Sequence, residues 1–327
     1  MKFMKIRAPD FDLRKTLDSG QVFHWQKSGD GLVGAIEERG VYVEQVGNVL
    51  KVRDGEPPSP TREPRVLPGL VAHYFALDHP MVAICESFPK DPVMNAARDF
   101  CRGLRIIRQP KWECLATFIC SSMKQVAHIR QISLALRKRF GDQRSVANQL
   151  VYTFPPAQRI ARVSEKELRN CKLGYRAKNL RATAQMVSSG KADLKAWSRL
   201  PDAELRKRLC ALSGVGPKIA NCVMLFAYER LRAFPIDVWI DRVLREHYFS
   251  RRKKMTAQRL REFSETYFGE HGGYAQQYLF HHARTGRRGN RAIEVNRPYL
   301  GRNEREVGAV HLNRRGRQPG KLSGPLA

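Results

Sequence analysis

The sequence predicts an α+β protein with an antiparallel β-rich N-terminal domain followed by a mostly α-helical domain that carries a helix-hairpin-helix. Two changes of hydrophobic period support this division. Residues 31–52 alternate apolar and polar side chains, as half-buried strands do, and from about residue 92 the apolar residues recur at helical spacing. We therefore expect a β-rich domain over 1–91, a helical domain over 92–283 and a basic tail over 284–327.

The β-rich segment GLVGAIEERGVYVEQVGNVLKV is interrupted by turn-forming pairs at Arg39-Gly40 and Gly47-Asn48. Alternating segments separated by such pairs are typical of a hairpin meander. The next stretch, GEPPSPTREP at 55–64, carries four prolines without apolar periodicity. We expect it to be a loop inside or beside the β-rich domain.

Helical signals follow. The run WECLATFICSSMKQVAHIRQISLALRKRF places apolar residues on one helical stripe, which predicts a helix packed in a core; they are Leu115, Phe118, Ile119, Val126, Ile129 and Leu136. Ser164 and Glu167 form a capping-box pattern, and Pro201-Asp202 precedes another helical run. Residues 284–327 have 11 Lys and Arg against 3 Glu, a net charge of +8, and few large apolar residues. We expect this tail to be disordered.

The whole chain has a net charge of +28, with 59 Lys and Arg against 31 Asp and Glu. Such an excess favours a polyanionic partner, and nucleic acid is the commonest one. The N-terminus lacks a signal-peptide core, and no segment has the ~18 apolar residues of a membrane span. The seven cysteines are scattered without a CxxC pair, which suits a reducing compartment. We expect a cytoplasmic protein, associated with the nucleoid in a bacterium, and no membrane partner.

A glycine hairpin is predicted in LSGVGPKIANCV at 212–223. Gly214 and Gly216 permit a tight turn between two helices, and Pro217 suits the first turn of the second helix. The backbone N–H groups of the turn, which includes Val215, can hold a DNA phosphate without reading sequence. Taken alone, the glycines also allow a non-catalytic DNA anchor or an ordinary corner between helices.

Two side chains near the hairpin have the chemistry of base excision. Lys218 begins the second helix, where the helix dipole disfavours a protonated amine. A neutral lysine can displace a base from a sugar and form a Schiff base, although most lysines of so basic a chain are solvated surface charges. Asp237 in FPIDVWIDRV fits an N-cap, and a carboxylate facing Lys218 can also stabilise a cationic sugar.

GVGPKIANC followed by PIDVWIDRV resembles the helix-hairpin-helix DNA glycosylases, and specifically the 8-oxoguanine DNA glycosylase/AP lyases. Four further segments are similar to that family in the same order, namely DSGQVFHW, GLRIIRQPKWECLATFICSS, LGYRAKNL and GYAQQYLF. The resemblance implies Lys218 as Schiff-base nucleophile and Asp237 as catalytic carboxylate, in base excision followed by β-elimination. It also implies double-stranded DNA with oxidised guanine as partner, a monomer, and neither metal nor organic cofactor.

The resemblance extends to the base pocket. It implies that the flipped 8-oxoguanine lies between Phe280 and Cys222, and that Gln276 reads its Watson–Crick edge. The carbonyl of Gly20 is then the acceptor for the N7–H group that guanine lacks. Without the resemblance, Phe280 and Cys222 would be interpreted as core residues.

The resemblance also implies contacts with the opposite strand. Tyr175 and Arg176 match residues that wedge into the base stack and contact the orphaned cytosine. Met123 stands in place of an asparagine of the family, and His128 in place of a cytosine-reading arginine. A preference for cytosine is therefore left open.

The phosphate contacts depart from the family pattern as well. Trp239 stands where many members have a phosphate-binding histidine, and Ala283 where that histidine has its aspartate partner. Because both members of the pair differ, we expect Trp239 to contact the DNA in another way.

Two alternatives remain open. An endonuclease III-like glycosylase for oxidised pyrimidines would use the same lysine and aspartate, but such enzymes usually have a C-terminal four-cysteine iron–sulfur loop, and this chain has no cysteine after Cys222. A non-catalytic DNA-binding protein would bind DNA without cleaving it.

Overall fold

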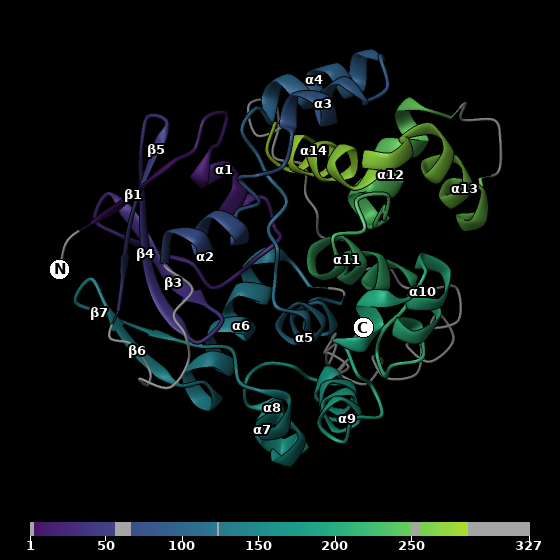
Figure 1. The fold of residues 1–327 in the computed structure, drawn as a ribbon. Coiled ribbons are helices and arrows are strands. Elements are labelled where there is room, and N and C mark those ends of the chain that lie inside the picture. The colour runs from purple at the N-terminus through teal and green to yellow at the C-terminus, as the bar shows by residue number, and fades with distance from the viewer. Residues whose placement is uncertain (1–2, 56–66, 123, 250–254, 287–327) are drawn as a thin grey trace, which may run out of the picture. The chain divides into compact units, whose positions relative to one another are not determined.

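The computed structural model describes residues 3–55, 67–122, 124–249 and 255–286. An antiparallel sheet comes first and helices follow (Figure 1), so the predicted α+β class is confirmed. The described residues all belong to one compact unit. The predictions made for the proline-rich segment, for Met123 and for the tail beyond residue 286 lie outside the described residues.

The N-terminal sheet has five antiparallel strands in the order β1-β5-β4-β3-β2. They are β1 Met4–Arg7, β2 Gln26–Ser28, β3 Gly31–Ile36, β4 Arg39–Val46 and β5 Val49–Asp54. The predicted meander is confirmed as β3-β4-β5, but its first turn lies at Glu37-Glu38 and not at Arg39-Gly40. Glu37 adopts a φ of 54°, whereas Arg39 is held in β4 by its ion pair with Asp54 at 2.7 Å.

Both faces of the sheet are covered. Alternate residues of β4 and β5, including Val43 and Val52, lie in one core cluster with residues of α2. On the other face, Val33 and Tyr42 pack against the hairpin of β6 Gln143–Val146 and β7 Gln149–Tyr152. Gly40 serves this contact rather than a turn, because an added Cβ would lie 3.1 Å from Arg144 Cβ. The hairpin interrupts the segment that the sequence predicted as mostly helical.

The remaining described chain is largely helical. The helices are α1 Leu13–Asp18, α2 Leu67–Tyr74, α3 Met81–Glu86, α4 Pro92–Phe100, α5 Lys111–Ser121, α6 Val126–Phe140, α7 Ala157–Arg162, α8 Glu165–Arg169, α9 Arg176–Ser188, η1 Ala196–Arg199, α10 Asp202–Cys210, α11 Pro217–Tyr228, α12 Val238–His247, α13 Ala257–Tyr267, η2 Gly269–His271 and α14 Gly272–Thr285. One core cluster joins most of them. Among these helices, none combines the length and apolar content needed to cross a bilayer.

The single helix predicted across 112–140 is two helices. Ser122 leaves the helical region with a ψ of 127°, and the hydroxyl groups of Ser121 and Ser122 donate to carbonyls of the last turn of α5. The apolar stripe continues into α6 because both helices contribute to the same core. Hydrophobic spacing alone does not reveal such a break.

The predicted helix starts are confirmed. Ser164 and Glu167 form a reciprocal capping box at α8, and α10 begins at Asp202. α11 begins at Pro217 and α12 is capped by Asp237. These starts place two chemically important side chains at the N-termini of helices α11 and α12.

A buried ion pair connects α5 with α6 below the sheet. Arg137 Nη2 donates to Glu113 Oε1, and both side chains are less than a tenth exposed. His24 Nδ1 lies 3.8 Å from the same carboxylate oxygen, while its Nε2 lies 2.9 Å from the Ala35 carbonyl of β3. Burial and the nearby Arg137 cation hold the pKa of His24 well below its usual range, so the ring is neutral in this contact between sheet and helices.

Candidate active site

The helix-hairpin-helix consists of α10, the turn at 211–216 and α11. Gly214 adopts a φ of 79°, and a Cβ there would lie 2.7 Å from Asn179 Cβ of α9, so only glycine fits this position. Ser213 Oγ donates to Asn179 Oδ1 at 3.0 Å, which further holds the turn against α9. The Val215 N–H donates to the Leu212 carbonyl at 3.1 Å, so in this conformation it is not available to a phosphate.

Six of the residues singled out in the sequence line one pocket. They are Gly20, Lys218, Cys222, Asp237, Gln276 and Phe280. Phe118, Phe226, Pro235 and Gln277 complete its lining. The pocket thus brings together α11, the start of α12, one face of α14 and the loop after α1.

Lys218 lies in the first turn of α11 and is partly buried. Its Nζ is 5.2 Å from the centroid of the Phe118 ring, which in turn stacks on Phe226 at 5.5 Å. Burial disfavours the charged amine, but the Cys222 sulfur and the Asp237 carboxylate favour it, and the pKa of Lys218 is raised overall. The expectation that its position would lower this pKa is therefore wrong, because the two neighbours outweigh burial.

Asp237 is the N-cap of α12. Its Oδ1 accepts hydrogen bonds from the backbone N–H groups of Trp239 at 3.0 Å and Ile240 at 2.9 Å, and its second oxygen is not used by this cap. Burial raises the pKa of Asp237, although Lys218 and the two N–H donors lower it in part. Capping and a place beside the lysine are thus combined in one carboxylate.

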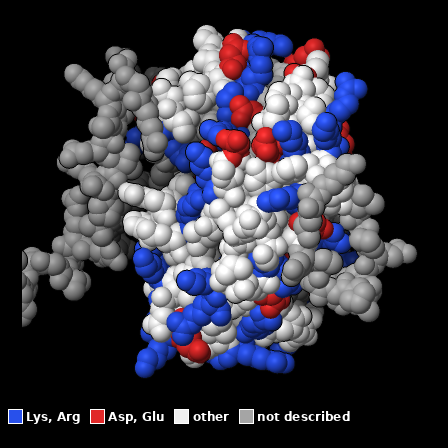
Figure 2. Space-filling view, turned by 90° about the vertical axis from the view of Figure 1, so that its left-hand side faces the viewer, with Lys and Arg blue, Asp and Glu red and all other residues white. Residues whose placement is uncertain are grey.

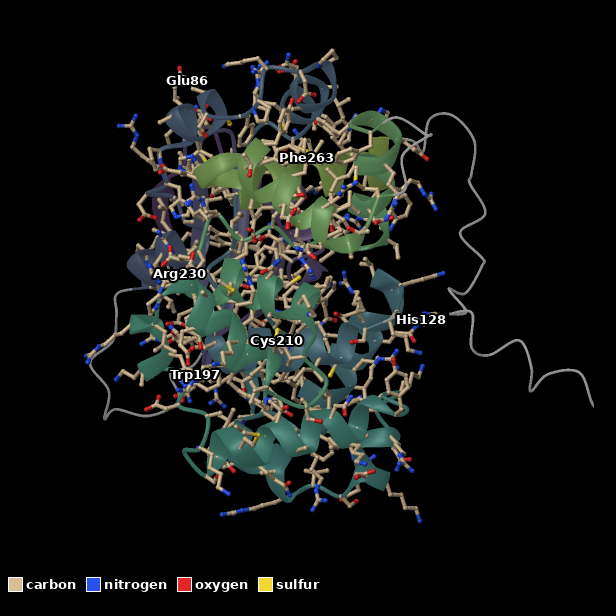
Figure 3. The ribbon with its side chains drawn as sticks, turned by 90° about the vertical axis from the view of Figure 1, so that its right-hand side faces the viewer. Glu86, His128, Trp197, Cys210, Arg230 and Phe263 are labelled. Atoms are coloured by element: carbon tan, nitrogen blue, oxygen red, sulfur yellow. The ribbon has the colours of Figure 1, made fainter. Side chains whose placement is uncertain are left out.

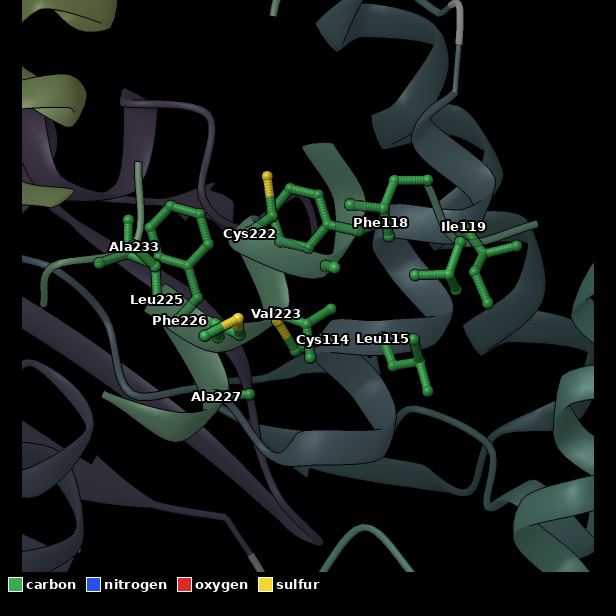
Figure 4. Packing of buried hydrophobic residues seen from close by; sticks show 14 of the residues in the cluster. Cys114, Leu115, Phe118, Ile119, Cys222, Val223, Leu225, Phe226, Ala227 and Ala233 are labelled. Carbon is green, nitrogen blue, oxygen red and sulfur yellow. The ribbon is translucent and has the colours of Figure 1, made fainter. Parts of the chain in front are cut away.

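The base-reading candidates lie one turn apart on α14. Gln276 is 4% exposed, and its Oε1 is buried without a hydrogen-bond partner among the described residues. A buried acceptor left unpaired costs about 1–3 kcal/mol, so this oxygen is suited to accept a hydrogen bond from a bound ligand. Phe280 faces the same pocket. Cys222 is buried next to the Phe118 ring, on the facing helices α11 and α5 (Figure 4).

Gly20 is in the loop between α1 and β2 and has a φ of 83°. A Cβ at this position would lie 3.1 Å from Cε1 of Phe280. Both the backbone conformation and the close approach of the ring therefore favour glycine. The loop contacts α14 directly at the pocket.

The opposite-strand candidates lie outside this pocket. Tyr175 is 59% exposed, whereas Arg176 is only 4% exposed. The Arg176 guanidinium donates to the Ser122 and Leu173 carbonyls and lies 4.2 Å from the Tyr175 ring centroid. Contrary to expectation, Arg176 is not presented to solvent. His128 is exposed near the start of α6 and lies at the edge of the molecule in the view of Figure 3.

Trp239 is partly buried against the main core cluster. Cζ of Arg242, one turn later on α12, lies 5.7 Å from the Trp239 ring centroid. Ala283 is 8% exposed within α14. Where many family members have a histidine, this chain therefore has the Trp239 ring with the Arg242 guanidinium beside it, close to the start of α12 at Asp237.

Several pocket residues were not identified from the sequence. Phe118 and Phe226 have helical spacing that is typical of core residues, and nothing in that pattern indicates a pocket. Gln277 follows Gln276 directly, and adjacent helical residues face different directions. Both glutamines line the pocket because the loop at Gly20 packs against α14, where Gln277 donates to the Ser19 carbonyl. Within the described residues, no group of three or more His, Cys, Asp and Glu side chains is arranged to hold a metal ion.

Comparison with known proteins relates both parts of the chain to DNA repair. Residues 4–115 match the model of the 8-oxoguanine DNA glycosylase N-terminal domain, and residues 116–266 match that of the HhH-GPD superfamily of base excision DNA repair proteins. A probable N-glycosylase/DNA lyase from Methanothermobacter thermautotrophicus is 27% identical over 86% of this chain and 96% of the relative. The N-glycosylase/DNA lyase OGG1 of Arabidopsis thaliana is 28% identical, and the match covers 85% of this chain and 78% of the relative.

Solved structures agree with these matches. The structure of MBOgg1 in complex with a low affinity DNA ligand superimposes with a TM-score of 0.79 and 31% identity, covering 87% of this chain and 99% of that one. The Clostridium acetobutylicum 8-oxoguanine glycosylase/lyase was solved with DNA containing cytosine opposite 8-oxoG. It has a TM-score of 0.78 and 28% identity, and the match covers 88% of this chain and 99% of that one. With its sheet, its helix-hairpin-helix and nearly the full length of these relatives, the chain belongs to the 8-oxoguanine DNA glycosylase/lyase family of the helix-hairpin-helix DNA glycosylase superfamily.

Proposed function

We propose that this protein excises 8-oxoguanine from double-stranded DNA and then cleaves the strand at the abasic site. One observation carries the proposal: Lys218 and Asp237 share a pocket with the buried, unpaired Oε1 of Gln276. This acceptor and the Gly20 carbonyl suit a base that has donors on two edges. 8-Oxoguanine has them at N1, N2 and N7, whereas guanine has an acceptor at N7.

The reaction begins when the base is flipped out of the duplex into the pocket. Neutral Lys218 attacks C1′, the bond from C1′ to N9 breaks, and the base leaves with its electron pair. Opening of the sugar ring produces a Schiff base between C1′ and the lysine. Removal of a proton from C2′ then breaks the bond from C3′ to its oxygen and releases the 3′ phosphate.

Two properties of Asp237 support a catalytic role. In the proposed complex its negative charge is next to the sugar carbon that becomes cationic as the base departs, and a preorganised charge at such a place stabilises the transition state. The same carboxylate helps to keep Lys218 protonated in the free enzyme. Lys218 must therefore lose a proton before attack, and Asp237, whose pKa is raised, is an adjacent acceptor for it.

DNA binding is supported by the net charge of +28. Figure 2 shows the side of the molecule that carries the N-terminal sheet, and Lys and Arg are widespread even on that face, which lies away from α10 and α12. We propose that the backbone N–H groups of Gly214 and Gly216 and the guanidinium of Arg242 beside Trp239 contact phosphates of the damaged strand. In the described residues, no carboxylate lies within ion-pair distance of Arg242.

We propose that Tyr175 contacts the opposite strand, because its exposed ring can fill the gap left by the flipped base. The Clostridium relative was solved with cytosine opposite the lesion. In this chain Arg176 is occupied by backbone carbonyls and His128 is exposed. We therefore propose only a weak preference for cytosine.

The test is borohydride trapping on duplexes that carry 8-oxoguanine opposite each of the four bases. Wild type is compared with Lys218→Gln and with Lys207→Gln, a matched loss of an exposed lysine on α10. We expect covalent adducts with wild type and Lys207→Gln but none with Lys218→Gln. Trapping on an oxidised-pyrimidine duplex alone would instead support the endonuclease III-like function, and no trapping with any duplex would refute catalysis through a lysine.

A further inference from the structure

The loop that carries Gly20 is held by side chains on both sides of that glycine. Three side chains donate to carbonyls on either side of it: Asp18 O accepts from Arg284 Nη2, Ser19 O from Gln277 Nε2 at 2.8 Å, and Gln21 O from Gln109 Nε2 at 3.0 Å. The Gln21 side chain adds bonds to the Arg105 carbonyl and the Ile107 N–H, each 2.8 Å long. Backbone flexibility at the glycine is thereby restricted.

The Gly20 carbonyl is the exception in this series. Among the described residues, no hydrogen-bond donor is directed at it, although its neighbours on either side are each occupied. The loop therefore leaves one carbonyl without a donor, at a residue that lines the pocket, while the flanking carbonyls are held by hydrogen bonds. A glycine with a φ of 83° has a wide choice of ψ when unrestrained, so the direction of this carbonyl depends on the anchors.

Gln277 is the anchor that also belongs to the pocket. It is 3% exposed, it lines the pocket, and it connects the loop to α14, the helix that carries Gln276 and Phe280. Its bond to Ser19 O joins residues 258 positions apart in the chain. One rigid helix thus sets the spacing between the base-reading glutamine, the stacking ring and the carbonyl of the loop.

We infer that Gln277 is a positioning residue that aims the Gly20 carbonyl at the N7–H group of the oxidised base. This inference rests on the proposed function. Gln277 acts through Gly20 and determines selectivity for 8-oxoguanine over guanine, while attack and strand cleavage use Lys218 and Asp237. Base recognition and lyase activity should therefore respond differently to its loss.

The test compares Gln277→Met, which keeps length but removes the donor, with Gln277→Glu, which places an acceptor opposite the Ser19 carbonyl. Gln258→Met on α13, where the glutamine is exposed, is the matched control. Each is assayed in single turnovers on an 8-oxoguanine duplex and on an abasic duplex. Binding is compared on 8-oxoguanine and guanine duplexes with Lys218→Gln as the background, so that no excision occurs.

We expect both Gln277 variants to excise 8-oxoguanine about 10- to 100-fold more slowly, the size of effect that misplacement near a reacting group produces. Cleavage of the abasic duplex should stay within about twofold of wild type, which also shows that the variants fold. Binding selectivity for 8-oxoguanine over guanine should fall in parallel.

An equal loss on both substrates would show a merely structural role and would overturn the inference, as would unchanged excision and selectivity. If the wild type cleaves abasic DNA but does not excise 8-oxoguanine, the proposed function itself fails, and the role assigned to Gln277 fails with it.

Discussion

Replacing Asp237 with asparagine separates its charge from its role as a helix cap. Asparagine caps helices about as well as aspartate, so both bonds to the start of α12 can be kept and stability should change by less than about 1 kcal/mol. The substitution removes only the negative charge beside the developing cation. Two unit charges about 4 Å apart interact by about 4 kcal/mol at an effective dielectric of 20.

Asp237 is partly exposed, which weakens this interaction, so we take about 2.7 kcal/mol, the lower end for loss of one preorganised catalytic group. Excision by Asp237→Asn should then be about 100-fold slower in single turnovers, with DNA affinity unchanged. Asp237→Ala should lose a similar factor in rate and, in addition, about 1 kcal/mol of stability from the missing cap. Urea unfolding measures that difference between the two variants.

The same substitution has a consequence for pH. The carboxylate favours the charged form of Lys218, so its removal lowers the pKa of the amine and increases the neutral fraction at a given pH. The pH–rate profile for cleavage of an abasic duplex should therefore shift to lower pH in Asp237→Asn. A variant that excises as fast as wild type with an unshifted profile would refute the role of Asp237 on both counts.

Other predictions concern the pocket and the buried ion pair. Gly20→Ala should slow excision, because a Cβ would lie 3.1 Å from Phe280 and the φ of 83° is strained; single-turnover assays check this against unchanged DNA affinity. Cys222→Ala removes a group that raises the pKa of Lys218, so lyase activity on an abasic duplex should appear at lower pH, and an upward shift would contradict this. Glu113→Gln leaves its arginine partner on α6 buried without a counter-charge and should cost about 3–5 kcal/mol in urea unfolding, whereas a neutral result would show that water or nearby carbonyls compensate.

Local patterns in the sequence were sufficient for much of the fold. Period-2 alternation predicted β3 to β5, and Ser164, Asp202 and Pro217 marked helix starts, because capping and strand burial depend on residues close in the chain. The predictions of element boundaries were wrong where contacts between distant parts of the chain determine the local structure. Gly40 is in a strand because another hairpin packs on it, and α5 separates from α6 although one apolar stripe runs through both.

The sequence by itself determined the fold class, the lysine at the start of α11 and the aspartate that caps α12, since short-range spacing and helix-end chemistry specify them. The family resemblance added the identity of the base-pocket residues. Only the tertiary structure decided the protonation tendency of Lys218, the burial of Arg176 and the anchoring of the Gly20 loop by Gln277. Each of these depends on charges or donors brought together from distant parts of the chain, and pKa values and hydrogen bonds respond to distance in space rather than to separation in sequence.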